Sequence, residues 1–150
     1  MKRVVLVAVL SLALGAATLS AQAAPAAPAR PAAAGNVVRV RMIQNGARYV
    51  FEPANFTVKV GDVVEFVNVS GGPHNIEFEK AKIPAGAEAV LNAGMPNRMS
   101  SLQGPMMVTP NQTYRINFAG APVGTYDYFC LPHKAMGMVG KITVQAAARR

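Results

Sequence analysis

The sequence contains few of the residues on which protein chemistry usually depends. It has one cysteine, two histidines and no tryptophan among 150 residues, and 7 acidic residues against 15 basic ones. A single cysteine excludes an intramolecular disulfide and any zinc site built on two or more thiolates. Two histidines exclude an all-histidine metal cage. The basic residues are scattered and no recognition motif accompanies them, so the formal charge of +8 does not predict nucleic-acid binding.

The N-terminal part of the chain lacks acidic residues and has the pattern of an export signal. Lys2 and Arg3 precede an apolar run over Val4–Leu14, and the AQA triplet at 21–23 matches a cleavage site with small residues. We therefore expect a secretory signal peptide over residues 1–23. An uncleaved N-terminal anchor is the alternative, although the apolar run is shorter than the about 20 residues that span a bilayer.

The rest of the sequence predicts one small domain between two short flanking segments. Residues 24–35 (APAAPARPAAAG) predict an extended Ala/Pro-rich linker, and residues 148–150 a basic tail. Loss of the leader lowers the formal charge from +8 to +6. We expect a monomeric domain over residues 36–147, in the periplasm or another extracytoplasmic compartment and without a membrane span. An idle free thiol is a liability in an oxidising compartment, so Cys130 needs a chemical role.

The domain reads as a series of short strands. Runs with alternating or continuous apolar residues are bounded by glycine, proline and asparagine, which is typical of an all-β sandwich or barrel. The expected strands are Asn36–Gln44, Tyr49–Phe51, Asn55–Val60, Val63–Val69, His74–Phe78, Thr113–Phe118, Thr125–Cys130 and Val139–Val144.

The connection over residues 79–112 differs from the strands because it is long and rich in proline and glycine. A short helix around Gly86–Asn92 is expected there, because that stretch contains good helix formers. Four methionines also lie in this region, at positions 95, 99, 106 and 107. Packing of the connection onto the sandwich accounts for them as adaptable filler. A methionine-rich surface that acquires copper is the alternative.

The residues that can carry chemistry lie in one C-terminal loop and at one distant histidine. Cys130, His133 and Met138 fall between two expected strands, and His74 follows a Gly-Gly-Pro turn. Two imidazoles and a thiolate with a weak axial thioether make a blue-copper site. The same residues also allow a buried cysteine that only packs, or a nucleophilic Cys–His pair, although no orienting Asn or Asp is evident. Spacing alone leaves these alternatives open.

A resemblance to a known family favours copper. The stretch YFCLPHKAMGMVGKITV resembles the C-terminal copper loop of plastocyanins, and PHNIEF (73–78) resembles their first copper loop. YVFEPANFTVKVGDVVEFVN (49–68) and IPAG (83–86) also fit, so the similarity covers most of residues 37–145. The resemblance implies a cupredoxin-type Greek-key β-sandwich of about seven or eight strands. It also implies one type 1 copper ion, Cu(I)/Cu(II), and electron shuttling between larger redox proteins.

The resemblance also assigns roles to individual residues. His74, Cys130 and His133 correspond to the strong equatorial ligands, and Met138 to the long axial one. Met136 competes for the axial role, but it lies two residues too early for the family spacing. In the family, the residue at Asn75 ties the two ligand loops together and its backbone N–H bonds the cysteine sulfur. Such contacts orient the ligands.

The family also suggests where electrons leave and which partner docks. The His133 edge would be the exit, surrounded by small or apolar residues: Gly71, Gly72, Pro73, Ala135 and Met136. Lys134 adds positive charge beside it, and the EKAK run at 79–82 replaces the acidic run of plant plastocyanins. Phe129 replaces their exposed tyrosine. We therefore expect transient redox partners with an acidic docking face.

The expected function is that of an exported type 1 copper electron carrier. A periplasmic copper-binding or delivery protein on the same fold, without a redox partner, is the alternative. Four protein ligands leave no open coordination position, which argues against an enzyme.

Pro132 provides a first testable prediction. Proline has no N–H, so Pro132 cannot donate a hydrogen bond to the sulfur of Cys130. Such a bond would draw electron density from the thiolate and raise the reduction potential. We expect Pro132→Ala to raise the potential measured by voltammetry. An unchanged or lower potential would contradict this expectation.

Overall fold

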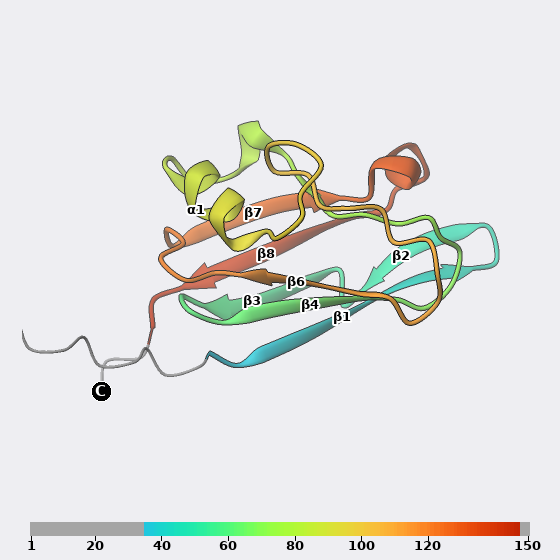
Figure 1. Cartoon of the computed structure of the whole chain (residues 1–150), viewed down its shortest axis with the longest axis horizontal. Coiled ribbons are helices and arrows are strands. Elements are labelled where there is room, and N and C mark those ends of the chain that lie inside the picture. The colour runs from blue at the N-terminus through green and yellow to red at the C-terminus, as the bar shows by residue number, and fades with distance from the viewer. Residues whose placement is uncertain (1–34, 148–150) are drawn as a thin grey trace, which may run out of the picture. The chain divides into compact units, whose positions relative to one another are not determined.

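Two sheets packed face to face form the domain. The computed structural model describes residues 35–147, in which eight strands and one α-helix are found (Figure 1). The strands are β1 (Val37–Asn45), β2 (Arg48–Glu52), β3 (Asn55–Lys59), β4 (Val63–Asn68), β5 (Glu77–Phe78), β6 (Thr113–Asn117), β7 (Gly124–Phe129) and β8 (Val139–Gln145). The helix α1 spans Ala87–Gly94, and short 3₁₀ segments span Lys80–Lys82 and Leu131–Met136. The expected all-β sandwich with a short helix in its middle connection is confirmed.

Three of the expected segments fall outside the part that the structure describes. They are the leader, the basic tail, and the linker apart from Gly35. Within the described residues, no helix has the length and hydropathy that crossing a bilayer would require.

The order of the strands in the sheets brings distant parts of the sequence together. The first sheet has the order β2-β1-β4-β6 and the second the order β3-β8-β7-β5. β1 pairs in parallel with β4 and β3 in parallel with β8, whereas the other pairs are antiparallel. The central strand β7 therefore separates β5 from β8 in the second sheet.

Alternating side chains from both sheets fill the space between them. On β1, Val40 and Met42 are fully buried, while the intervening Arg41 faces solvent. The rings of Phe51 and Phe66 pack edge to face, and Phe66 does the same with Tyr128 from the opposite sheet. Full burial of a side chain of this size contributes about 1.5–3 kcal/mol. The period-two pattern of the sequence thus corresponds to one continuous core.

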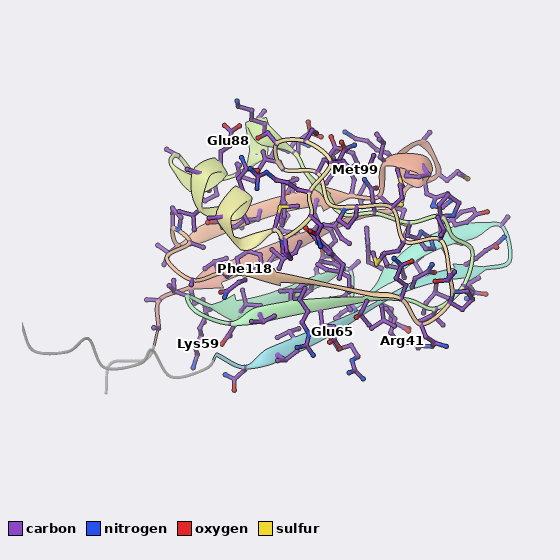
Figure 2. All side chains as sticks on the ribbon, viewed as in Figure 1. Arg41, Lys59, Glu65, Glu88, Met99 and Phe118 are labelled. Carbon is purple, nitrogen blue, oxygen red and sulfur yellow. The ribbon has the colours of Figure 1, made fainter. Side chains whose placement is uncertain are left out.

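The long middle connection covers part of the sandwich, and the segment that leads into it differs from expectation. Only Glu77–Phe78 of the expected strand 74–78 forms β5, because His74 instead makes an isolated bridge with Met107. The four methionines have different surroundings. Met95 and Met107 are buried in the core, which agrees with packing, whereas Met99 is 60% exposed (Figure 2).

A buried carboxylate lies on the outer face of the first sheet, between two arginines. Glu65 on β4 accepts hydrogen bonds from Arg39 on β1 at 2.8 Å and from Arg115 on β6 at 2.7 Å (Figure 2). Its side chain is 4% exposed. The hydrogen bonds from Arg115 and then Arg39 hold the pKa of Glu65 below its ordinary value, against the opposing effect of burial. This ion triad joins the three neighbouring strands.

The triad predicts a pH-dependent contribution to stability. Because the folded pKa of Glu65 is depressed, its stabilisation is present above the unfolded pKa near 4.5 and is lost as the pH falls through the folded value. We expect Glu65→Gln to lower the free energy of unfolding by about 1 kcal/mol at pH 7, since solvent screens both arginine heads. Urea unfolding at pH 7 and pH 3 measures the effect, which should shrink at pH 3.

A matched control is Glu52→Gln, because Glu52 pairs with Arg41 where both side chains are exposed. We expect little change in this variant. Equal losses of stability in the two variants at pH 7, or no dependence on pH for Glu65→Gln, would contradict the prediction.

Candidate metal centre

Three ligand atoms of the kind that bind metals meet at one end of the sandwich. Cys130 Sγ lies 3.6 Å from Nδ1 of His74 and 3.4 Å from Nδ1 of His133, and the two Nδ1 atoms are 3.2 Å apart. His74 and Cys130 are fully buried and His133 is 6% exposed. The structure therefore brings together the three predicted equatorial ligands, although 56 residues separate His74 from Cys130.

Strand pairing explains this convergence. β5 runs antiparallel to β7 with Glu77 opposite Phe129, so the residues before β5 lie beside Cys130, which follows β7. β7 also pairs with β8, with Phe129 opposite Val139, and this places Met138 next to Cys130. The N–H of Cys130 donates to the carbonyl of Met138 at 3.1 Å.

The orientation of His74 leaves Nδ1, the nitrogen that faces Cys130 and His133, free to bind a metal. Its Nε2 lies 2.9 Å from the carbonyl oxygen of Ser70, which only an N–H can satisfy. In the neutral ring, Nδ1 therefore carries a lone pair. Burial lowers the pKa of His74. Burial also lowers the pKa of His133, and electrostatic repulsion from His74 adds a smaller lowering. Both effects favour neutral imidazoles, the form that coordinates metals.

The sulfur of Cys130 is buried beside two backbone N–H groups. Burial raises the pKa of the thiol, and the backbone N–H groups of Asn75 and His133 oppose this rise. A backbone N–H of Asn75 near the sulfur is what the family resemblance implies for that residue, and its bond to the sulfur stays a prediction. The N–H of His133 itself donates to the carbonyl oxygen of Cys130 at 3.1 Å.

The donor set fits a copper ion. A point equidistant from Sγ and the two Nδ1 atoms lies about 2 Å from each, comparable to the bond lengths of about 2.0–2.3 Å that imidazole and thiolate form with zinc. Two imidazoles, one thiolate and a methionine are the donors of blue-copper sites. Coordination by a cation deprotonates the thiol outright, which offsets the effect of burial.

The two candidate axial methionines differ in burial. Met138 is fully buried and follows the end of the ligand loop, where its N–H donates to the carbonyl of His133 at 3.1 Å. Met136 is 51% exposed. A ligand to a buried metal must itself be buried, so the structure favours Met138.

The side chain of Asn75 connects the two ligand loops. Its Oδ1 accepts the N–H of Leu131 at 2.8 Å, and the residue is fully buried. Because Asn75 follows His74 and Leu131 follows Cys130, this bond links the two ligands through one residue on each side.

The surface around His133 has the expected residues but less free charge than expected. Its exposed neighbours in the sequence-predicted set are Gly72, Pro73, Lys134, Ala135 and Met136. Lys134 is not a free cation, because its Nζ lies 2.7 Å from the carboxylate of Glu79 and 3.7 Å from the centroid of the Phe129 ring. The local positive charge predicted from the sequence is thus largely neutralised.

Sequence reasoning missed Tyr49. Its ring stacks on His133 with 3.8 Å between centroids and 9° between planes. The residue lies at the start of β2, and only the position of an aromatic residue beside the β1–β2 turn could have drawn attention to it.

Comparisons with known proteins agree with this site. The family described as copper binding proteins, plastocyanin/azurin family, matches residues 38–145. A plastocyanin from Scenedesmus fuscus is 39% identical over 110 residues, which cover 72% of this chain and 99% of the relative. A plastocyanin from Rumex obtusifolius is 33% identical over 108 residues, which cover 72% of this chain and all of the relative.

Solved structures give the same result. A pseudoazurin from Sinorhizobium meliloti matches with a TM-score of 0.56 at 30% identity, covering 75% of this chain and 76% of that one. The oxidised plastocyanin of Dryopteris crassirhizoma matches with a TM-score of 0.55 at 28% identity, covering 72% of this chain and all of that one. With its sandwich fold and its buried donor set of two histidines and one cysteine beside a buried methionine, the chain belongs to the plastocyanin/azurin family of copper-binding proteins.

Proposed function

We propose that the chain is an exported type 1 copper electron carrier that passes one electron at a time between larger redox proteins. The observation that carries this proposal is the buried triangle of Cys130 Sγ and the Nδ1 atoms of His74 and His133. A bound copper ion would supply the one-electron change between Cu(I) and Cu(II). His74, Cys130 and His133 would hold it strongly, and Met138 weakly along the axis.

The contribution of the protein is to keep these ligands in place. Asn75 joins the two ligand loops, and Ser70 fixes the ring of His74 by its carbonyl oxygen. Cu(I) and Cu(II) prefer different ligands and geometries. A ligand set held between those preferences changes little when the oxidation state changes. The reorganisation that accompanies electron transfer is then small.

The edge of His133 is the proposed electron exit. It is the most exposed of the three buried ligands, and small or apolar residues around it allow a partner to approach closely. Gly72, Pro73, Ala135 and Met136 are exposed there. A small apolar contact of this kind suits the weak and short-lived association of redox proteins.

The charges of the domain suggest a modest electrostatic attraction to an acidic partner. Ten of the 15 basic residues and all seven acidic ones lie within 36–147. Four lysines of the domain are paired with carboxylates: Lys134 with Glu79, Lys80 with Glu88, and Lys82 and Lys141 with Asp127. The residual positive charge is therefore spread over the domain instead of concentrated at His133, and its attraction is screened by salt.

The expected leader over residues 1–23 supports a site of action outside the cytoplasm. The folded domain would then work in the periplasm or an equivalent compartment, as a monomer that meets its partners transiently. Four protein ligands leave no open coordination position for a substrate, which supports a carrier and not an enzyme.

Substitution of the two methionines tests the axial assignment. We expect Met138→Leu to raise the reduction potential and change the electron paramagnetic resonance spectrum, because it removes a weak donor that favours Cu(II). Leucine has nearly the volume of methionine, so packing is preserved. Met136→Leu is the matched control and should leave both measurements unchanged. The opposite pattern would assign the axial position to Met136.

Copper loading of the protein tests the proposed function itself. We expect the Cu(II) form to be intensely blue, with one reversible one-electron wave in voltammetry, and the Cys130→Ser variant to lose the colour. A colourless Cu(II)-loaded wild-type protein would contradict an electron carrier and favour copper delivery.

The same protein allows the proposed attraction to be measured with small redox probes. Oxidation of the reduced protein by anionic hexacyanoferrate(III) should slow as ionic strength rises, because the protein carries net positive charge. Glu79→Gln frees Lys134 and should make this dependence steeper, whereas Lys134→Gln should make it shallower. A salt dependence that is absent or reversed in sign would contradict the expected steering toward acidic partners.

A further inference from the structure

The ring of Tyr49 covers one face of the outermost ligand. The Tyr49 and His133 rings are nearly parallel, 3.8 Å apart between centroids and 9° between planes. The same tyrosine meets the His74 ring edge to face at 6.3 Å and 67°. Within residues 35–147, Tyr49 is thus the aromatic residue outside the ligand set that contacts both imidazoles, and the proposed electron transfer gives it no role so far.

The β1–β2 turn is held against the first ligand loop, which fixes the position of Tyr49. Tyr49 pairs with Gln44 across the two strands, and the N–H of Gln44 donates to Ser70 Oγ at 3.1 Å. Gly71 follows with φ +78°, and a Cβ there would contact the side chains of Gln44 and Tyr49. Only glycine allows this approach without displacing the ring.

The two histidines are oriented by different means. Nε2 of His74 donates to the carbonyl oxygen of Ser70 at 2.9 Å, and this bond fixes the plane of the His74 ring. Among residues 35–147, no hydrogen bond holds Nε2 of His133; only its Nδ1 has polar neighbours, and these are the other two ligands. The stack with Tyr49 is therefore the contact that restrains the plane of this imidazole.

We propose that Tyr49 is a positioning residue for His133. It keeps the imidazole plane fixed so that Nδ1 stays directed at Cys130 Sγ and the Nδ1 of His74, with metal or without. Rotation of the imidazole out of the stack would drive its edge into a ring that already lies near van der Waals distance. Tyr49 would thereby limit the movement of His133, at the proposed exit, when a bound copper ion changes its oxidation state. This second effect rests on the proposed function.

The effect on ring motion can be measured without copper. We expect Tyr49→Leu to increase microsecond-to-millisecond exchange broadening of the His133 ring signals in NMR spectra of the metal-free protein. Tyr49→Phe keeps the stack and should retain the wild-type signals. Phe56→Leu is the control for general loss of stability, because Phe56 is a half-buried aromatic residue on β3 that contacts Tyr128.

The copper-loaded protein gives the second measurement. We expect Tyr49→Leu to slow electron self-exchange by up to about tenfold, which is the change in rate that the energy of a strong aromatic pair would produce. The rates of Tyr49→Phe and Phe56→Leu should stay near that of the wild type. Unchanged His133 ring signals in metal-free Tyr49→Leu would overturn the positioning role. Ring signals altered equally in Phe56→Leu would overturn it as well. A wild-type protein that fails to exchange electrons would instead overturn the proposed function, and the NMR comparison would still decide the role of Tyr49.

Discussion

The metal centre depends on antiparallel pairing of β7 with two neighbours at once. One neighbour, β5, carries the segment with His74, and the other, β8, follows Met138. Cys130 at the end of β7 therefore has a ligand segment on each side. A shift of either register by one residue would turn side chains to the opposite face of the sheet and separate the ligands. The buried core between the sheets fixes the register, so the packing of the core also determines the positions of the ligands.

Burial around the ligand atoms has opposing effects on the acid–base chemistry of the site. It favours neutral imidazoles, which suits coordination, and a protonated thiol, which does not. The backbone N–H groups of Asn75 and His133 partly compensate at the sulfur. A cation must provide the remaining stabilisation of the thiolate. The preference for a soft or borderline metal comes from the donors themselves, a thiolate and two imidazoles.

Most of the fold and the ligand set could be predicted from the sequence, for physical reasons. The strands follow a period of two. The single cysteine and two histidines allow one two-histidine, one-cysteine site, and the resemblance to plastocyanins implies that these residues bind copper. Other features depend on contacts between distant residues. Lys134 pairs with Glu79, 55 residues away, so its charge could not be judged from its neighbours. The stack of Tyr49 on His133 likewise depends on how the β1–β2 turn lies against the ligand loop. β5 begins only at Glu77 and not at His74, because His74 bridges to Met107, a contact that local propensity does not encode.

The anchored Lys134 also affects the entropy of docking. A free lysine beside a contact surface samples many rotamers, and a partner that immobilises it loses about 0.5–1.5 kcal/mol of binding free energy. Here Glu79 and the Phe129 ring already hold the ammonium group in the unbound protein. Lys134, at the rim of the proposed exit, is thus held in place before any partner arrives. A partner that docked there would therefore lose less binding free energy to the ordering of this side chain.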